Sequence, residues 1–176
     1  MKELDASFFA RDTLDVARLL LGKIISVGSC SGRIVEVEAY KDDEASHAFR
    51  RTGRSEIMYS TYGHVYVYFI YGMYCCLNFT TEKEGMPGAV LIRAIVPLTG
   101  ISVIKKRRGV AVQEKDLCSG PGKLCIALGV GLSVNGTVVG SKVKLFDDGF
   151  IFSKVERSCR IGISKAKELE WRFIAT

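Results

Sequence analysis

The stretch "RIVEVEAY", residues 33–40, has the alternating pattern of a β-strand. It is unusual because two glutamates and a tyrosine occur at alternate positions, and the prediction of the fold starts from this strand. Side chains alternate across a strand, so one apolar face consists of Val35, Val37 and Ala39. The opposite face consists of Ile34, Glu36, Glu38 and Tyr40. A half-buried strand with its polar face in water would explain this pattern. Two carboxylates and a phenol side by side could equally form a site.

The segments around this strand predict a single domain over residues 1–176. Further strands are indicated by "KIISVG" (23–28), by a hairpin within 64–81 that turns near residues 71–73, and by "AVLIRAIVPL" (89–98). Strands follow one another with few helices between them, which is typical of the α+β class. We expect a mainly antiparallel sheet with flanking helices and a protruding β-hairpin.

Three helices and one long loop complete this prediction. Residues 12–21 should form an amphipathic helix that Asp12 or Thr13 caps and Gly22 ends. Further short helices are expected within 99–108 and after the loop that opens 119–130. Residues 41–63 read as a long, mostly irregular connection, and such loops in compact domains tend to be functional. Residues 137–150 and 160–173 suggest short strands and a basic tail.

Composition limits the class of protein. The chain has 176 residues and 48% hydrophobic residues, enough for one domain with a real core. Its first residues include acids and lack the apolar run of a signal peptide, and residues 65–81 favour sheet over a membrane helix. We therefore expect a cytoplasmic protein without a membrane partner, whose six cysteines are reduced.

Metal sites are not indicated by the sequence. Cys118 and Cys125 have a spacing used by some iron–sulfur enzymes, but the close following cysteines that such a cluster needs are missing. Only His47 and His64 exist, and no His/Cys spacing suits zinc. We therefore expect no metal.

The charge is strongly basic and unevenly distributed. The net charge is +6 with a pI near 9.0, which is common in proteins that bind a polyanion, although a solubilising surface has the same signature. Basic residues group at Arg50, Arg51 and Arg54, at 105–108, and from 154 to 172. Five of the nineteen acids lie between Glu36 and Glu44, an island that chemistry explains better than solubility does.

Several residues could take part in chemistry. Glu36 and Glu38 would lie roughly 6–7 Å apart along a strand, within the range of glycosidase carboxylate pairs. Arg93 interrupts an apolar strand and should pair with one of them, because an unpaired buried charge is costly. Tyr71 lies at the hairpin tip, where an aromatic ring could insert between bases or simply belong to a packed face. "SGPGK" (119–123) could hold one phosphate or be a plain helix cap.

Seven segments that occur in order form a recognisable set: "GRIVEVEAY", "ASHAFR", "YVYFIYGMYCCLN", "GAVLIRA", "LCSGPGKLC", "RIGI" and "WRF". Through these segments the sequence resembles the alkyladenine (3-methyladenine) DNA glycosylase family, and the resemblance covers most of the chain beyond about residue 10. The resemblance implies a compact mixed domain that flips a damaged purine out of duplex DNA and hydrolyses its glycosidic bond, as a monomer and without a metal or organic cofactor.

The resemblance also implies roles for particular residues. Glu38 matches the residue that activates water, and Arg93 and the backbone carbonyl of Ile161 match the groups that hold this water. The base would stack among Tyr40, His47 and Tyr68, and Asn78 would screen its minor-groove edge. Tyr71 matches the tyrosine that fills the gap left in the duplex. Glu36 matches no residue of known role.

Two departures from the family pattern flank this site. Thr52–Ser55 replace a Thr-Pro-Arg-Asn-like stretch, and Thr61–Gly63 replace a Pro-Gly entry to the hairpin. No lysine occupies a matched catalytic position, so we expect a monofunctional glycosylase without a strand-cleaving step. Two alternatives remain at this stage: a carbohydrate glycosidase that uses Glu36 and Glu38, and a non-catalytic module that binds lesions in nucleic acid.

Overall fold

The strand predicted from "RIVEVEAY" lies at the centre of the sheet. A computed structural model describes all 176 residues, and in it β3 (Cys30–Tyr40) is one of the two longest strands. Its first half pairs with β2 (Ile24–Val27), its second half pairs with β9 (Arg172–Ala175), and its opposite edge pairs with β6 (Ala89–Thr99). The second half of β3 is therefore enclosed by strands on both sides.

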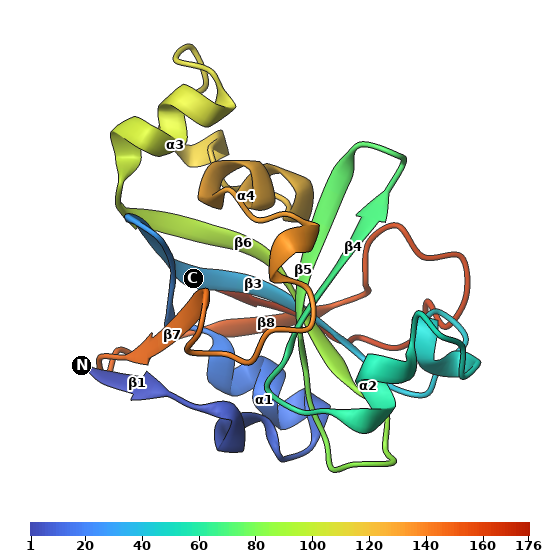
Figure 1. Cartoon of the computed structure of the whole chain (residues 1–176). Helices are drawn as coiled ribbons and strands as arrows, with labels where there is room; N and C mark the ends of the chain where they lie inside the picture. The colour runs from blue at the N-terminus through green and yellow to red at the C-terminus, as the bar shows by residue number, and fades with distance from the viewer.

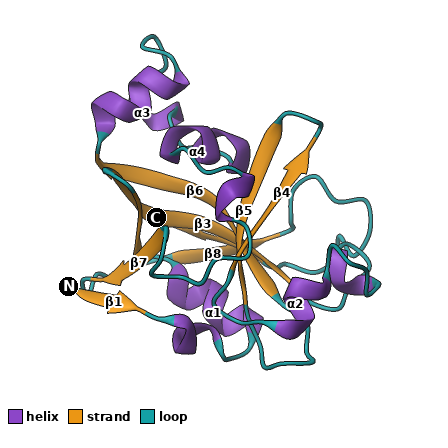
Figure 2. Cartoon of the chain, viewed as in Figure 1, coloured by secondary structure: helices purple, strands orange, loops and turns teal.

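The sheet has nine strands, and every pairing in it is antiparallel. The order along its main path is β1-β7-β2-β3-β6-β5-β4, with β9 joined to β3 and β8 joined to β9. The remaining strands are β1 (Lys2–Leu4), β4 (Val65–Ile70), β5 (Tyr74–Thr80), β7 (Val143–Asp147) and β8 (Val155–Ser158). The predicted α+β class with a mainly antiparallel sheet is confirmed (Figure 2).

Helices cover the sheet on two sides. Figure 1 shows α1 (Thr13–Leu20) on one side of β3 and β6, and α3 (Ile101–Arg108) with α4 (Pro121–Leu128) on the other. The fourth helix, α2 (Glu56–Ser60), lies near the loops that follow β3. Single turns of 3₁₀-helix occur at Ala6–Phe9, His47–Phe49, Glu114–Asp116 and Leu132–Val134.

The predicted first helix is confirmed, with its cap. The Asp12 carboxylate accepts a hydrogen bond from the Leu14 amide, and Asp12 is the residue before the helix. The helix ends before Gly22, whose φ of +86° favours glycine. Its apolar face buries Val16 and Leu20 in the main core, which also includes side chains of β3 and α4.

An irregularity in the pairing of β3 with β6 changes the simple alternation of side chains. The register shifts between Ile34 and Glu36, so Val35 is an extra residue in β3. Ile34 is consequently fully buried in the core with Val37 and Ala39, while Val35 lies outside that core. The prediction that Ile34 shares a face with the two glutamates, and that Val35 belongs to the apolar face, was therefore wrong.

Other differences from the prediction concern short elements. The connection 41–63 is less irregular than expected, because it contains α2 and one turn of 3₁₀-helix. Strands β1 and β8 were not predicted, and residues 160–171 contain no strand before β9 begins at Arg172. None of the helices is long and apolar enough to cross a bilayer. All six cysteines are free thiols, and five of them are buried.

The hairpin β4–β5 projects from the sheet, as predicted (Figure 1). Tyr71 and Gly72 both have positive φ, 51° and 67°, and the Met73 amide donates to the Ile70 carbonyl, which defines a tight type I′-like turn. A tyrosine in this conformation is strained. The turn leaves the Tyr71 side chain 81% exposed.

Candidate active site

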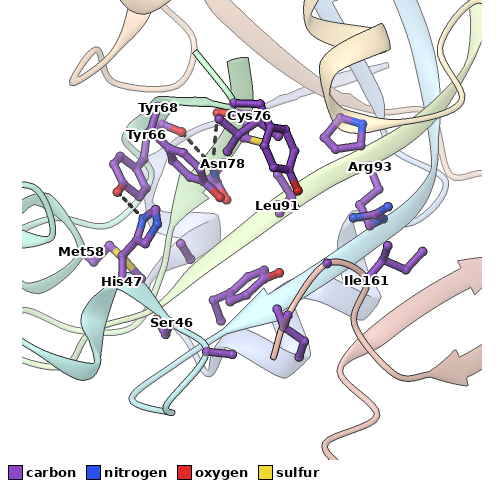
Figure 3. Close-up of a pocket in the computed structure, with 18 residues that line it drawn as sticks. Ser46, His47, Met58, Tyr66, Tyr68, Cys76, Asn78, Leu91, Arg93 and Ile161 are labelled. Atoms are coloured by element: carbon purple, nitrogen blue, oxygen red, sulfur yellow. Dashed lines mark hydrogen bonds between the residues drawn. The ribbon is translucent and has the colours of Figure 1, made fainter. Parts of the chain in front are cut away.

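A cavity of about 220 Å³ opens between the hairpin, the second half of β3 and the C-terminal tail (Figure 3). Most of its lining is aromatic or apolar, and the polar groups are few. The lining residues that the sequence predicted are Tyr40, His47, Tyr68, Tyr71, Asn78, Arg93 and Ile161. Every predicted site residue except Glu38 therefore lines one cavity.

Glu38 lies directly behind the wall of this cavity, and its side chain is 0% exposed. Its Oε1 accepts a hydrogen bond of 2.7 Å from the Ile161 amide and lies 3.2 Å from Arg93 Nη1. Its Oε2 accepts a hydrogen bond of 2.8 Å from the Tyr40 hydroxyl. All three partners line the cavity, so the Glu38 carboxylate is separated from it only by residues with which it is in direct contact.

Tyr40 remains a hydrogen-bond donor to Glu38. Burial, followed by the charge of Glu38, holds the pKa of this phenol far above its usual range. The guanidinium of Arg160 lies over the Tyr40 ring, 4.7 Å from its centroid. Strand β3 therefore presents a tyrosine whose hydroxyl and ring are both fixed by charged neighbours.

Arg93 pairs with both glutamates rather than with one. Its Nε donates to Glu36 Oε1 at 2.9 Å, and its Nη1 reaches Glu38. Glu36 Oε1 also accepts from Arg172 Nε at 2.7 Å. The predicted ion pair is confirmed, and the polar face of β3 is not in water but is enclosed by two arginines.

The aromatic wall comes from the β4 strand and the loop after β3. The His47 and Tyr68 rings meet edge to face, with centroids 4.5 Å apart, and His47 Nδ1 lies 2.8 Å from the Tyr66 hydroxyl. Burial, with a smaller contribution from the charge of Arg54, lowers the pKa of His47 below its ordinary 6.5. His47 is therefore a neutral ring at physiological pH.

Asn78 is 2% exposed and lies beside this wall on β5, where it is the residue paired with Tyr66 (Figure 3). Its Nδ2 donates to the carbonyls of Tyr66 and Cys76, at 3.1 and 3.3 Å, and thereby fixes the orientation of the amide. Burial raises the pKa of the neighbouring Cys76 thiol to about 11, so this thiol stays protonated. Asn78 and Cys76 are thus both uncharged groups in the lining of the cavity.

Sequence reasoning missed two residues that organise the site. Tyr66 contributes the hydroxyl that contacts His47. Arg160 is 4% exposed, forms an ion pair with Asp43 at 2.6 Å, and donates to the Ala39 carbonyl at 3.1 Å. It therefore ties the tail, including Ile161, to β3 and to the loop after it. Its Nε is a buried donor without a partner.

Other sequence features have structural contacts of their own. In "SGPGK", Pro121 is the first residue of α4 and lines the cavity, and Lys123 Nζ donates to Ser119 Oγ at 3.2 Å. Within the basic run of α3, Arg107 donates to the Ala127 carbonyl at the end of α4, and Arg108 donates to Leu117. Much of this basic run therefore stabilises the fold. No group of three or more His, Cys, Asp or Glu side chains is suited to hold a metal ion.

A small aromatic pocket beside a buried, oriented carboxylate, in a basic protein, is typical of enzymes that act on a single nucleobase. The comparison with known proteins identifies the class. The profile of the methylpurine-DNA glycosylase (MPG) family matches residues 7–176. The chain belongs to this family, whose members are hydrolases of N-glycosyl bonds in DNA, and the prediction of a DNA glycosylase is confirmed.

Individual relatives agree with the family match. A protein of Agrobacterium fabrum is 47% identical over 174 residues, which cover 97% of this chain and 88% of the relative. A protein of Methanocella arvoryzae is 43% identical over 98% of this chain and 92% of its own length. A protein of Chlorobaculum parvum is 44% identical over all of this chain and 88% of its own. All three are named as 3-methyladenine DNA glycosylases.

Proposed function

We propose that this enzyme flips an alkylated or deaminated purine of the 3-methyladenine type out of duplex DNA and hydrolyses its N-glycosidic bond. The products are the free base and an abasic site, as required for base excision repair. Residues 1–176 act as one glycosylase domain, and the enzyme works as a monomer. Because its substrate is chromosomal DNA, the proposed location is the cytoplasm, at the nucleoid if the organism is bacterial.

The size and lining of the cavity support a flipped base as its occupant. Its volume of about 220 Å³ is below the roughly 300–1,000 Å³ of sites for drug-sized ligands, so one purine is a better fit than an oligosaccharide. Tyr40, Tyr68 and the neutral His47 offer ring faces and edges for stacking. Many alkylated purines are cationic, and a cation is attracted to the face of a tyrosine ring.

The contacts of Glu38 support its role as the base that activates water. Oε1 accepts a hydrogen bond from the Ile161 amide and also forms the ion pair with Arg93, whereas Oε2 accepts a hydrogen bond only from the Tyr40 hydroxyl. Oε2 is therefore the oxygen that can accept a proton from water. The water must reach it through the cavity, past the hydroxyl that covers this oxygen.

The proposed chemical step needs no cofactor. As the bond from C1′ to the base breaks, its electron pair leaves with the base and positive charge develops on the sugar, which the Glu38 carboxylate stabilises. Water forms the new bond to C1′ and transfers its proton to Glu38 Oε2. The family resemblance adds the carbonyl of Ile161 and the guanidinium of Arg93 as groups that hold this water.

The hairpin and β5 supply recognition in this proposal. Tyr71, exposed at the tip, fills the space that the flipped base leaves in the duplex. Asn78 lies against the minor-groove edge of the bound base. No lysine lines the cavity, so the proposed reaction has no covalent imine intermediate and no strand-cleaving step.

The buried carboxylate behind an aromatic cavity is the observation on which the proposal rests, and base release tests it. Duplex DNA carrying 3-methyladenine, 7-methylguanine, hypoxanthine or ethenoadenine should release free base and acquire abasic sites. The strands should break only after alkali. Binding of these duplexes without any release of base from any of them would contradict the proposal.

A further inference from the structure

Glu36 lies at the centre of a buried group of charges, yet nothing in the reaction described above uses it. Its Oε1 accepts from two guanidinium Nε atoms, those of Arg93 at 2.9 Å and Arg172 at 2.7 Å. The side chains are 17% exposed for Glu36, 12% for Arg93 and 21% for Arg172. A carboxylate in this position interacts with its partners far more strongly than a surface ion pair does.

The pairing of β3 with β6 explains why Arg93 reaches both glutamates. Glu36 is opposite Ala94, and Val37 is opposite Ile92, so Arg93 is an extra residue in β6. A bulge of this kind redirects a side chain. Arg93 therefore extends between the two carboxylates, with Nε at Glu36 and Nη1 at Glu38.

The division of its donors matters for Glu38. An arginine and a carboxylate prefer two parallel hydrogen bonds, one to each carboxylate oxygen. Such a pairing of Arg93 with Glu38 would cover Oε2, which is the oxygen left to accept a proton from water. Glu36 holds Nε, and the closest approach of Arg93 to Glu38 is from Nη1 to Oε1, at 3.2 Å.

We infer that Glu36 is a positioning residue, which holds Arg93 at Nε so that Glu38 keeps one oxygen available for water. This inference rests on the proposed function. Arg172, on the neighbouring strand β9, fixes Glu36 from the opposite side and balances its charge. Two carboxylates occur in "RIVEVEAY" because one takes part in the reaction and the other orients the arginine between them.

Two substitutions of Glu36 separate the effect of its hydrogen-bond acceptor on Arg93 from the effect of the size of its side chain. Glu36→Met keeps the length of the side chain but removes every acceptor, so Arg93 is free to turn toward Glu38. Single-turnover base release should fall about tenfold, because misplacement of this kind is costly, while the affinity for lesion-containing duplex stays within about threefold. Glu36→Gln keeps an oxygen that can accept from Nε, and it should recover most of the rate.

A control substitution comes from the same strand. Arg33 forms an ion pair with Asp148 at 2.7 Å and does not line the cavity. Arg33→Gln should lower the melting temperature but leave the rate of base release unchanged. A fall in rate that is as large in Arg33→Gln as in Glu36→Met would show that loss of any β3 ion pair has this effect, and would overturn the inference.

The crystal structure of Glu36→Met provides a second readout. We expect Arg93 to contact both oxygens of Glu38 in that variant. An unmoved Arg93 with an unchanged rate would overturn the inference, as would equal loss of rate in Glu36→Met and Glu36→Gln. Two further measurements distinguish failure of this inference from failure of the proposed function. If Glu38→Gln is fully active, the proposed role of Glu38 fails and the inference about Glu36 fails with it. If the unsubstituted enzyme releases no base from any lesion, the proposed function itself fails. If only Glu38→Gln is inactive, the role of Glu36 alone fails.

Discussion

The floor of the cavity and the tip of the hairpin differ in almost every physical respect. At the floor, Glu38 is 0% exposed and its carboxylate has three donors from three different segments of the chain. At the tip, Tyr71 is 81% exposed, Met73 is 65% exposed, and the turn between them is strained. The floor is fixed by buried contacts before any ligand arrives, and the tip has few contacts of its own.

This difference suggests a division of labour. Groups that stabilise charge in a transition state are most effective when they are already oriented, and the floor has this property. An exposed apolar tip gains contacts only when it enters another molecule. Substitutions at the floor should therefore change the rate of bond cleavage with little effect on DNA binding, whereas substitutions at the tip should change binding and flipping.

The largest effect is expected from Glu38→Gln. An amide cannot accept the proton from water, so base release should fall at least about a hundredfold while DNA binding is retained. Single-turnover release, with binding measured by anisotropy, tests both parts. Glu36→Gln is the matched control, and equal loss of activity in the two variants would show that the assignment within the pair is wrong.

Salt should weaken the binding of DNA to the protein surface and leave bond cleavage at the floor of the cavity unchanged. With a net charge of +6, affinity for undamaged duplex should fall by about tenfold or more between 50 and 200 mM salt, because bound phosphates release counterions. The rate of base release from saturated enzyme should stay nearly constant over this range. A flat plot of log affinity against log salt would exclude an extensive phosphate-contacting surface.

Tyr71→Ala tests the tip by itself. Loss of the ring leaves the vacated space in the duplex unfilled, so affinity for lesion-containing DNA should fall about tenfold. Tyr62, which is also an exposed aromatic but lies outside the hairpin, is the matched position for a control Ala variant. Unchanged affinity and unchanged flipping in Tyr71→Ala would rule out its proposed role.

Asn78 lies between the two regions, and its substitution should change selectivity. Guanine differs from hypoxanthine by an amine on its minor-groove edge. In the proposed pocket the Asn78 amide, which two hydrogen bonds fix, would exclude this amine by steric conflict. Asn78→Ser should raise excision of guanine relative to hypoxanthine several-fold, and loss of the two hydrogen bonds should cost about 1–2 kcal/mol of stability. A lower melting temperature with an unchanged ratio would mean that Asn78 only ties the hairpin.

The smallest effect concerns pH. Because the pKa of His47 is lowered below 6.5, the folded protein binds less proton there than the unfolded chain, so this residue destabilises the fold as pH falls below 6.5. An NMR titration should place the His47 midpoint below 6.5. Arg54→Gln should raise this midpoint slightly, since burial is the larger cause. A midpoint above 6.5 would contradict the buried, neutral ring.

The features that could be predicted from the sequence are those with local or strongly costly signals. The Asp12 cap, the alternation around Glu38 and the charge of Arg93 within an apolar strand each restrict the structure by themselves. The extra residue Val35 left no such signal, because a bulge depends on the partner strand. Helix α2 has only five residues, which is too short for a helical period to be visible.

In the site, too, the residues that were missed have no local signal in the sequence. Arg160 occurs in a basic tail most of whose other charges are exposed, and only the fold shows that it is buried against Asp43 and Tyr40. Its position beside Ile161 was the one available clue. Tyr66 was not among the predicted site residues, since its contact with His47 joins segments that are far apart in sequence.

The central claim is that flipping depends on the tip and bond cleavage on the floor, and one paired measurement tests it most directly. A fluorescent base analogue beside the lesion reports flipping while released purine is counted in the same samples. Glu38→Gln should give the full flipping signal without release of base, and Tyr71→Ala should give a reduced flipping signal with release that falls in proportion. Loss of both signals together in Glu38→Gln would contradict the account.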